Sequence, residues 1–261
     1  MKLPLYHIDA FTDKPFAGNP AAVVPLTEWL SDEILQNIAA ENNLAETAFY
    51  VKTEEGFHLR WFTPTMEVDL CGHATIASAL VIFNYQDYPE KMIRFQSRSG
   101  ELTVTHEDGW YKLNFPVDQY QIAVPPPALA ESLNVAFSEV FKGKTDYLVI
   151  VDSEEEVRNL ELDIIILSTI PARGIIVSAP GDDVDFVSRF FAPQSGIDED
   201  PVTGSAHTTL IPYWADKLSK TSLTAKQISK RGGYLQCELV EDRVNIAGQA
   251  RLYLKGEIEI D

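Results

Sequence analysis

Two short segments carry side chains suited to proton-transfer chemistry. The segment IDEDPVTGSAH, residues 197–207, places Asp200 before a proline and a Thr-Gly-Ser turn, and VDLCGHAT, residues 68–75, places His73 directly after Gly72. A turn of small residues before an apolar run is typical of a helix start, where unpaired N–H groups and a partial positive charge attract anions. Each segment therefore combines an expected anion site with a group that can exchange a proton.

The glycine of each turn, Gly72 or Gly204, lets a ligand approach the backbone closely. We expect the two helix starts to face each other and to bind a substrate carboxylate. The same N–H donors would stabilise the enolate-like charge that forms when a proton leaves the carbon beside a carboxylate.

Proton removal also needs a base, and the segment NNLAETAFY, residues 42–50, offers Glu46 at the start of an expected strand. Its small and apolar neighbours would disfavour the charged form of the carboxylate, as a general base near neutral pH requires. A glutamate at a strand start more often faces solvent. The segment by itself leaves both interpretations open.

Segments of the first half recur in the second half in the same order. RWFTP (60–64) matches RFFAP (189–193) at an offset of 129, and DLCGHATIAS (69–78) matches DPVTGSAHTTL (200–210), with Gly72 against Gly204 at an offset of 132. A third match pairs SGELTV and the strand after it with GGYLQCELVEDRVNIAG (232–248). Offsets of about half the chain length indicate two copies of one domain.

The elements between these segments are mostly strands. Alternating or continuous apolar runs predict strands at 5–12, 21–26, 46–51 and 57–63, and a hairpin turning at Asp108-Gly109. Ser31 is expected to cap a helix that runs to about Asn42, Gly204 to start a helix in the second half, and the proline run at 124–129 to form a linker.

The run GHATIASALVIFNY, residues 72–85, is apolar on all sides and long enough for a buried helix. Such a helix must be covered all round, and the surrounding segments are strand-like. We therefore expect an α+β fold with two pseudo-symmetric domains, each a mostly antiparallel sheet wrapped around a central helix. The expected domains are residues 1–120, joined by a strand at about 250–261, and residues 121–249.

Composition narrows the function classes. The net charge of −18 opposes binding to nucleic acid or to an anionic membrane surface, so a small-molecule partner is expected. The two cysteines cannot form a disulfide framework or a cysteine metal cluster, which fits a reducing compartment. With no segment that resembles a signal peptide or a membrane span, we expect a cytoplasmic protein.

Four ordered motifs resemble those of the PhzF-like family, which includes the phenazine-biosynthesis isomerase. The motifs are AFTDKPFAGNPAAVV (10–24), ENNLAETAFYV (41–51), LRWFTPTMEVDLCGHATIASA (59–79) and DEDPVTGSAH (198–207), and the resemblance extends over essentially the whole chain. The resemblance implies the diaminopimelate epimerase fold and cofactor-independent isomerisation of the trans-2,3-dihydro-3-hydroxyanthranilate type, without metal. It also implies that the protein forms a homodimer.

The same resemblance assigns roles to single residues. It implies that Glu46 is the catalytic base and that His73 and Asp200 contact the substrate and assist the proton shift. It places Gly72, Gly204 and Ser205 at the substrate carboxylate, and Asn19 beside the site. One carboxylate can remove a proton from one ring carbon and return it to another on the same face.

Several alternatives remain. An epimerase or racemase of this fold uses two cysteines, but the position matching Cys71 is Thr203, whose hydroxyl is too weak an acid. A serine hydrolase would need Ser205 beside His207, two residues apart on one helix, where side chains do not face each other. A metal site of His73, Asp200 and His207 lacks a recognised ligand spacing. A non-catalytic protein that binds a small acid is the remaining alternative.

Overall fold

A computed structural model describes residues 1–260, and the chain divides into two compact units. Unit 1 comprises residues 1–115 and 245–261, and unit 2 comprises residues 116–244. In the described residues, no helix is both long enough and apolar enough to cross a membrane.

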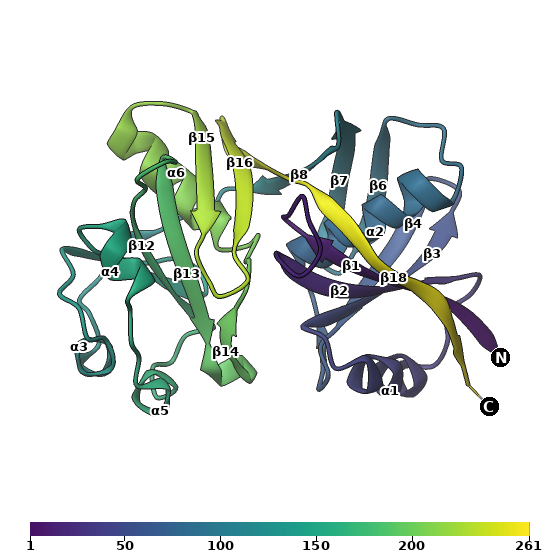
Figure 1. The fold of residues 1–261 in the computed structure, drawn as a ribbon, viewed down its shortest axis with the longest axis horizontal. Helices are drawn as coiled ribbons and strands as arrows, with labels where there is room; N and C mark the ends of the chain where they lie inside the picture. The colour runs from purple at the N-terminus through teal and green to yellow at the C-terminus, as the bar shows by residue number, and fades with distance from the viewer. Residues whose placement is uncertain (261) are drawn as a thin grey trace. The chain divides into compact units, whose positions relative to one another are not determined.

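Unit 1 is a mixed sheet with two helices (Figure 1). Its elements are β1 (Lys2–Ala10), β2 (Asn19–Leu26), α1 (Asp32–Asn42), β3 (Glu46–Thr53), β4 (Gly56–Phe62), β5 (Glu67–Val68), α2 (Gly72–Tyr85), β6 (Met92–Ser97), β7 (Gly100–Glu107), β8 (Trp110–Pro116) and β18 (Ala250–Glu259). The strands pair in the order β18-β1-β2-β3-β4-β6-β7-β8, antiparallel except for β2–β3 and β4–β6.

The sheet of unit 1 curls around α2. This helix packs against β1, β2, β3, β7 and β18, so strands near both ends of the row reach it. Every residue of α2 from Gly72 to Ile82 is buried, which confirms the central helix predicted from the apolar run. On the other face of the sheet, α1 covers Val24 and Phe49, and Ser31 caps it as expected.

Unit 2 repeats this arrangement. Its elements are β9 (Gln121–Ile122), α3 (Pro127–Ser132), β10 (Glu139–Lys142), β11 (Asp146–Ile150), α4 (Glu154–Arg158), α5 (Ile164–Leu167), β12 (Gly174–Pro180), β13 (Phe186–Ala192), the 3-10 turn η1 (Pro193–Ser195), β14 (Ile197–Asp200), α6 (His207–Leu218), β15 (Ser222–Gln227) and β16 (Gly233–Val240). A further strand, β17 (Arg243–Gly248), begins in unit 2 and ends in unit 1. The order β9-β10-β11-β12-β13-β15-β16 is antiparallel except for β11–β12 and β13–β15.

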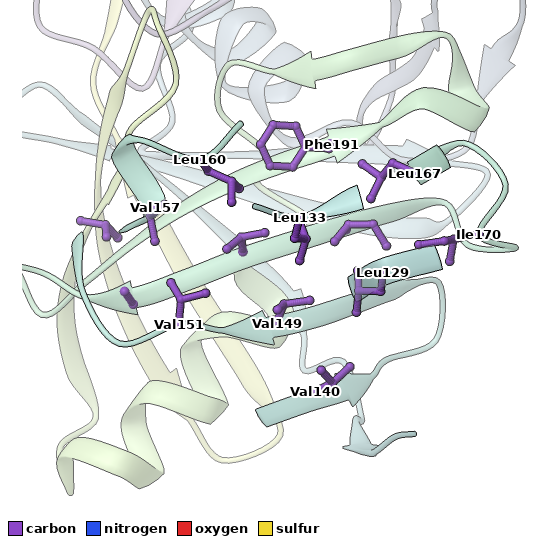
Figure 2. Close-up of a cluster of buried hydrophobic side chains, with 14 residues drawn as sticks. Leu129, Leu133, Val140, Val149, Val151, Val157, Leu160, Leu167, Ile170 and Phe191 are labelled. Carbon is purple, nitrogen blue, oxygen red and sulfur yellow. The ribbon is translucent and has the colours of Figure 1, made fainter. Parts of the chain in front are cut away.

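The central helix of unit 2 is α6. Trp214 on this helix donates a hydrogen bond to Ser178 on β12 and stacks on Phe186 of β13. On the opposite face of the sheet, α3, α4 and α5 cover a cluster of hydrophobic side chains that includes Val149, Val177 and Phe191 (Figure 2). The central strands β11, β12 and β13 therefore have both faces covered.

A repeated ion pair supports the duplication. Arg60 on β4 binds Glu67 on β5 with two hydrogen bonds, and Arg189 on β13 binds Glu199 on β14 in the same way. The two arginines are separated by the offset read from the sequence, and the strands that carry them have the same place in their units. The structure therefore shows the architecture predicted from the sequence, two pseudo-symmetric units that each wrap a mostly antiparallel sheet around a central helix.

Two local predictions were wrong. The proline run at 124–129 is not a linker between the units, because Pro127 begins α3 inside unit 2. The helix of the second half begins at His207 and not at Gly204. Residues 204–206 form tight turns first, in which N–H groups bond to the third carbonyl back, as from His207 to Gly204.

Candidate active site

Strand alternation brings Asn19 and Glu46 to the same side of the sheet in unit 1. They are the first residues of β2 and β3, which run parallel, and Ala21 pairs with Glu46. Side chains two residues apart share a face, and Val24 and Phe49 mark the face covered by α1. Asn19 and Glu46 therefore lie on the opposite face, toward α2, where His73 is the second residue of the helix.

The three side chains form a contact chain. Nε2 of His73 lies 3.1 Å from Oε2 of Glu46, and Nδ1 of His73 lies 3.1 Å from Nδ2 of Asn19. Asn19 is fully buried and the His73 side chain is 5% exposed, whereas the Glu46 side chain keeps 13% of its surface exposed. Glu46 is thus the member of the chain that a ligand can reach.

The Glu46 carboxylate favours the protonated form of His73. Burial alone would lower the pKa of His73, but Cys71 and Glu46 outweigh it, and the pKa is raised well above its ordinary value. Asn19 can present either an amide N–H or a carbonyl oxygen, so it can meet Nδ1 in either protonation state of the ring. This arrangement suits a histidine that exchanges a proton with Glu46.

Cys71 is a buried thiol and not a thiolate. Its Sγ lies 3.4 Å from Nδ1 of His73. Burial, followed by the negative charge of Glu46, raises the pKa of Cys71 to about 11. Because the thiol keeps its proton near neutral pH, the charge that stabilises protonated His73 comes from Glu46.

In unit 2, the loop from Asp200 to Ser205 is held from one side by Gln227. Gln227, on β15, accepts a hydrogen bond from the Thr203 amide at 2.8 Å and donates one to the Asp200 carbonyl at 2.7 Å. The Thr203 hydroxyl in turn donates to the Asp200 carboxylate. Asp200 and Gln227 are both buried, so the acidic side chain is fixed in place.

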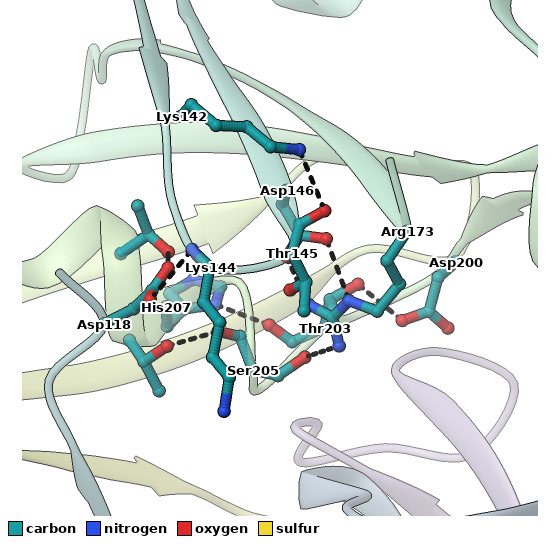
Figure 3. A network of polar contacts seen from close by, with 12 residues as sticks. Asp118, Lys142, Lys144, Thr145, Asp146, Arg173, Asp200, Thr203, Ser205 and His207 are labelled. Atoms are coloured by element: carbon teal, nitrogen blue, oxygen red, sulfur yellow. Dashed lines mark hydrogen bonds and ion pairs between the residues drawn. The ribbon is translucent and has the colours of Figure 1, made fainter. Parts of the chain in front are cut away.

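Arg173 holds the same loop from another side (Figure 3). Its Nη1 donates to Oγ of Ser205 at 2.9 Å, and its Nε donates to Asp146 at 2.8 Å. Burial alone would lower the pKa of Arg173, but the hydrogen bond and charge of Asp146 outweigh it and the pKa is raised. The guanidinium therefore stays charged next to the Gly204–Ser205 turn.

His207 has a structural environment. Its Nδ1 lies 2.8 Å from the Thr203 carbonyl, and since a carbonyl only accepts, this nitrogen carries the proton. The ring is fully buried, and burial lowers the pKa of His207 to about 4. Because Ser205 accepts from Arg173 and His207 donates to Thr203, the pair needed by a serine hydrolase is not formed.

One group of side chains could hold a metal ion. Ligand atoms of Glu46, Cys71 and His73 lie within 4.8 Å of one another. Oxygen, sulfur and nitrogen donors together suit Zn²⁺, provided that the thiol loses its proton. No metal site was expected from the sequence.

The predicted residues thus form two groups, one in each unit. Unit 1 brings together Glu46, His73 and Asn19, with Gly72 as the first residue of α2. Unit 2 places Asp200, Gly204 and Ser205 on one loop. Arg173, Asp146 and Gln227 were not predicted from the sequence, because none of them lies in a recognisable motif. Gln227 and Arg173 contact the loop from 24 and 32 residues away, and Asp146 supports the loop through Arg173.

Comparison with known proteins matches this chain to one family over nearly its full length. The family model described as phenazine biosynthesis-like protein (PhzC-PhzF) matches residues 8–256. A Pseudomonas aeruginosa protein named as an uncharacterized isomerase is 49% identical over 260 residues, covering 100% of both chains.

Solved structures agree with the family match. A phenazine biosynthesis protein of the PhzF family from Enterococcus faecalis superimposes with a TM-score of 0.97 at 47% identity, covering 100% of both chains. A probable proline racemase from Agrobacterium radiobacter has a TM-score of 0.64 at 10% identity, covering 99% of this chain and 93% of that one, which shows a shared fold only. The chain belongs to the PhzC-PhzF family of phenazine biosynthesis-like proteins.

Proposed function

We propose that the chain is an isomerase that moves a proton within a small amino or hydroxy acid, with Glu46 as the general base and no cofactor. The observation that carries the proposal is the contact of Glu46 with a buried histidine. A carboxylate 3.1 Å from Nε2 of His73, with part of its surface still exposed, can take a proton from a ligand and share it with the ring. The name of the Pseudomonas aeruginosa relative, an isomerase, supports the reaction class.

The proposed reaction follows that of trans-2,3-dihydro-3-hydroxyanthranilate isomerisation. Glu46 takes a proton from one carbon, and the electron pair of the broken C–H bond moves into the conjugated system of the substrate. The protonated Glu46 returns the proton to another carbon on the same face. His73 and Asp200 bind amino or hydroxyl groups, and the backbone at Gly72 and Gly204, with Ser205, binds the carboxylate.

Two observations favour this reaction over a two-thiol epimerase. Cys71 keeps its proton near neutral pH because burial raises its pKa to about 11. Thr203, at the matching position, donates its hydroxyl to Asp200. A racemase would need an acid and a base on opposite faces of the carbon, and neither group has that character.

The test is deuterium exchange. The protein is incubated with trans-2,3-dihydro-3-hydroxyanthranilate and with a panel of amino and hydroxy acids in D₂O, and incorporation at carbon is followed by NMR. Glu46→Gln keeps the shape of the side chain and should slow exchange by about 10² to 10⁴-fold, the usual contribution of a general base. Glu101→Gln, at an exposed position on β7, is the control and should exchange at the wild-type rate.

Two further arms separate the alternatives. Cys71→Ser should retain exchange, whereas a thiol mechanism would lose it. Treatment with a metal chelator should leave the rate unchanged, whereas a catalytic metal at Glu46, Cys71 and His73 would be removed together with activity. Full exchange in Glu46→Gln would refute the proposed base, and binding without exchange for every acid would favour a non-catalytic acid-binding protein.

A further inference from the structure

The Arg173 side chain is fixed on several sides. It precedes β12, and its Nε and Nη2 donate to the two carboxylate oxygens of Asp146, the first residue of β11. Asp146 is 2% exposed, and the guanidinium lies over the Phe190 ring with its carbon 5.5 Å from the ring centroid. A planar group held along one edge and on one face has a single orientation. In that orientation, Nη1 reaches Oγ of Ser205 (Figure 3).

This contact determines the role of the Ser205 hydroxyl. A guanidinium only donates hydrogen bonds, so Oγ of Ser205 must accept from Arg173. The hydroxyl hydrogen then points elsewhere, and within residues 1–260 no group accepts it. The Ser205 carbonyl is already used by the amide and the hydroxyl of Thr208. The hydroxyl is therefore presented as a donor for a group that the protein does not supply.

Arg173 also has donors left over. Three of its N–H groups bind Asp146 and Ser205, and a guanidinium has five. Within the described part of the chain, the other two make no hydrogen bond, and the side chain is 36% exposed. A hydroxyl donor beside a partly exposed guanidinium matches the two oxygens of a carboxylate.

The repeat in the fold gives an independent reason to connect these residues. In unit 1, Asn19 begins the first strand of the parallel pair β2–β3 and supports His73, the residue after the glycine of the turn. In unit 2, Asp146 begins the first strand of the corresponding pair β11–β12. It supports Ser205, which also follows the glycine of its turn, through Arg173. By register the two residues are not equivalent, because Asp146 pairs with Gly174 whereas Asn19 lies two residues before Ala21, the partner of Glu46. Both units nevertheless use a residue near the start of the first strand of the pair to orient the same position of the turn.

We propose that Arg173, held by Asp146, is the positioning residue that aims the Ser205 hydroxyl at the substrate carboxylate and so makes the site selective for carboxylic acids. This inference rests on the proposed function only in taking a small acid as the ligand. It assigns to Arg173 and Asp146 a role that neither the motifs nor the comparisons indicate.

The experiment compares two probes that differ in one group. 3-Hydroxyanthranilate is an aromatic amino acid with no proton to shift between ring carbons, and 2-aminophenol is the same ring without the carboxylate. Binding of each is measured by calorimetry for the wild type, Arg173→Met, Ser205→Ala and the double variant. Arg158→Met, which changes an exposed arginine on α4, is the matched control.

The wild type should bind 3-hydroxyanthranilate at least tenfold more tightly than 2-aminophenol. Arg173→Met and Ser205→Ala should each weaken binding of 3-hydroxyanthranilate by about 10- to 100-fold, the effect of losing a hydrogen bond to a charged group. The double variant should lose little more affinity than the single variant with the larger loss, because both changes disrupt the same carboxylate-binding arrangement. Affinity for 2-aminophenol should not change in any variant, and Arg158→Met should match the wild type for both probes.

A structural role alone would give a different pattern. If Arg173→Met loosened the loop, binding of both probes would fall together and the preference for the carboxylate would remain. Losses that multiply in the double variant, or a wild type without preference for 3-hydroxyanthranilate, would also overturn the inference. Arg173→Lys provides a second variant that keeps the charge. This variant should lose the preference for the carboxylate as well, because an ammonium lacks the planar, rigid set of donors with which a guanidinium bridges Asp146 and Ser205.

The Glu46→Gln variant tests the proposed function separately from this inference. Glu46→Gln should bind 3-hydroxyanthranilate with the wild-type preference even though it exchanges slowly. Full exchange in Glu46→Gln together with a preference that depends on Arg173 would refute the base and leave this inference standing. Exchange that requires Glu46, together with a carboxylate preference unaffected by Arg173→Met, would support the base and refute this inference.

Discussion

The buried His207 should make the protein less stable as the pH falls from 7 to 5. Burial lowers the pKa of His207 to about 4 in the folded state, whereas the unfolded chain has a pKa near its ordinary value of 6.5. Between these values the unfolded state binds more protons, so the free energy of unfolding falls as the pH is lowered. The loss begins below about pH 6.5 and is complete below about pH 4.

The size of the effect follows from the two pKa values. A difference of about 2.5 pKa units corresponds to about 3 kcal/mol over the whole window, of which about 2 kcal/mol is lost between pH 7 and pH 5. His73 acts in the opposite direction, because its pKa is raised and its contribution to stability is lost as the pH rises above about 6.5. This contribution is common to the wild type and to a variant at residue 207, so the difference between the two proteins reports His207.

The assay is urea unfolding followed by circular dichroism at pH 7 and pH 5. His207→Asn removes the titrating ring and keeps an N–H that can donate to the Thr203 carbonyl. This variant should be less stable than the wild type at pH 7, and its free energy of unfolding should change by about 2 kcal/mol less between the two pH values.

His58→Asn, at a partly exposed strand position, is the control and should keep most of the wild-type loss. Equal losses in the wild type and His207→Asn would refute the reasoning that His207 is a buried neutral residue. That result would reopen a role for this ring in ligand or metal binding.

Two further predictions concern the loops that carry the site. Gln227→Leu removes the partners of the Thr203 amide and the Asp200 carbonyl, and it should lower the free energy of unfolding by about 3 kcal/mol in urea denaturation. Gln236→Leu, at an exposed position, should change the free energy of unfolding little. Equal effects of the two substitutions would contradict the role of Gln227 in holding the loop. Gly18→Ala should cost more stability than Gly100→Ala in the same assay, since both have positive φ but only a Cβ at residue 18 would lie 2.1 Å from a backbone oxygen, that of Ala10.

The parts of the fold that follow local rules could be predicted from the sequence. The apolar run at 72–85 required a covered helix, and Ser31 capped the helix before β3 as its position suggested. Asp108 and Gly109 both have positive φ, as the tight hairpin turn demands. The repeated motifs indicated two similar domains, because the same segments must bury the same faces in each copy.

The supporting contacts of the site could not be predicted in the same way. The residue Asn19 reaches His73 across 54 positions, and Arg173 reaches Ser205 across 32. A single polar residue carries no periodic signal, and only the pairing of strands shows which ones meet. The predicted start of α6 was wrong for another reason. Gly204 and Ser205 favour a turn, and three tight turns satisfy the backbone before the α-helical pattern begins at His207.

The return of β18 to β1 has a consequence for the order of folding during synthesis. Residues Ala250–Glu259 pair along Lys2–Ala10, so unit 1 takes one strand from each end of the described chain. Unit 2 is continuous, and it leaves the ribosome in full before β18 does. The second domain in sequence is therefore the first that can fold completely, contrary to the usual N-terminal-first order. A nascent chain lacking β18 leaves α2 without one of the strands that pack against it, so the environment of Glu46 and His73 matures late.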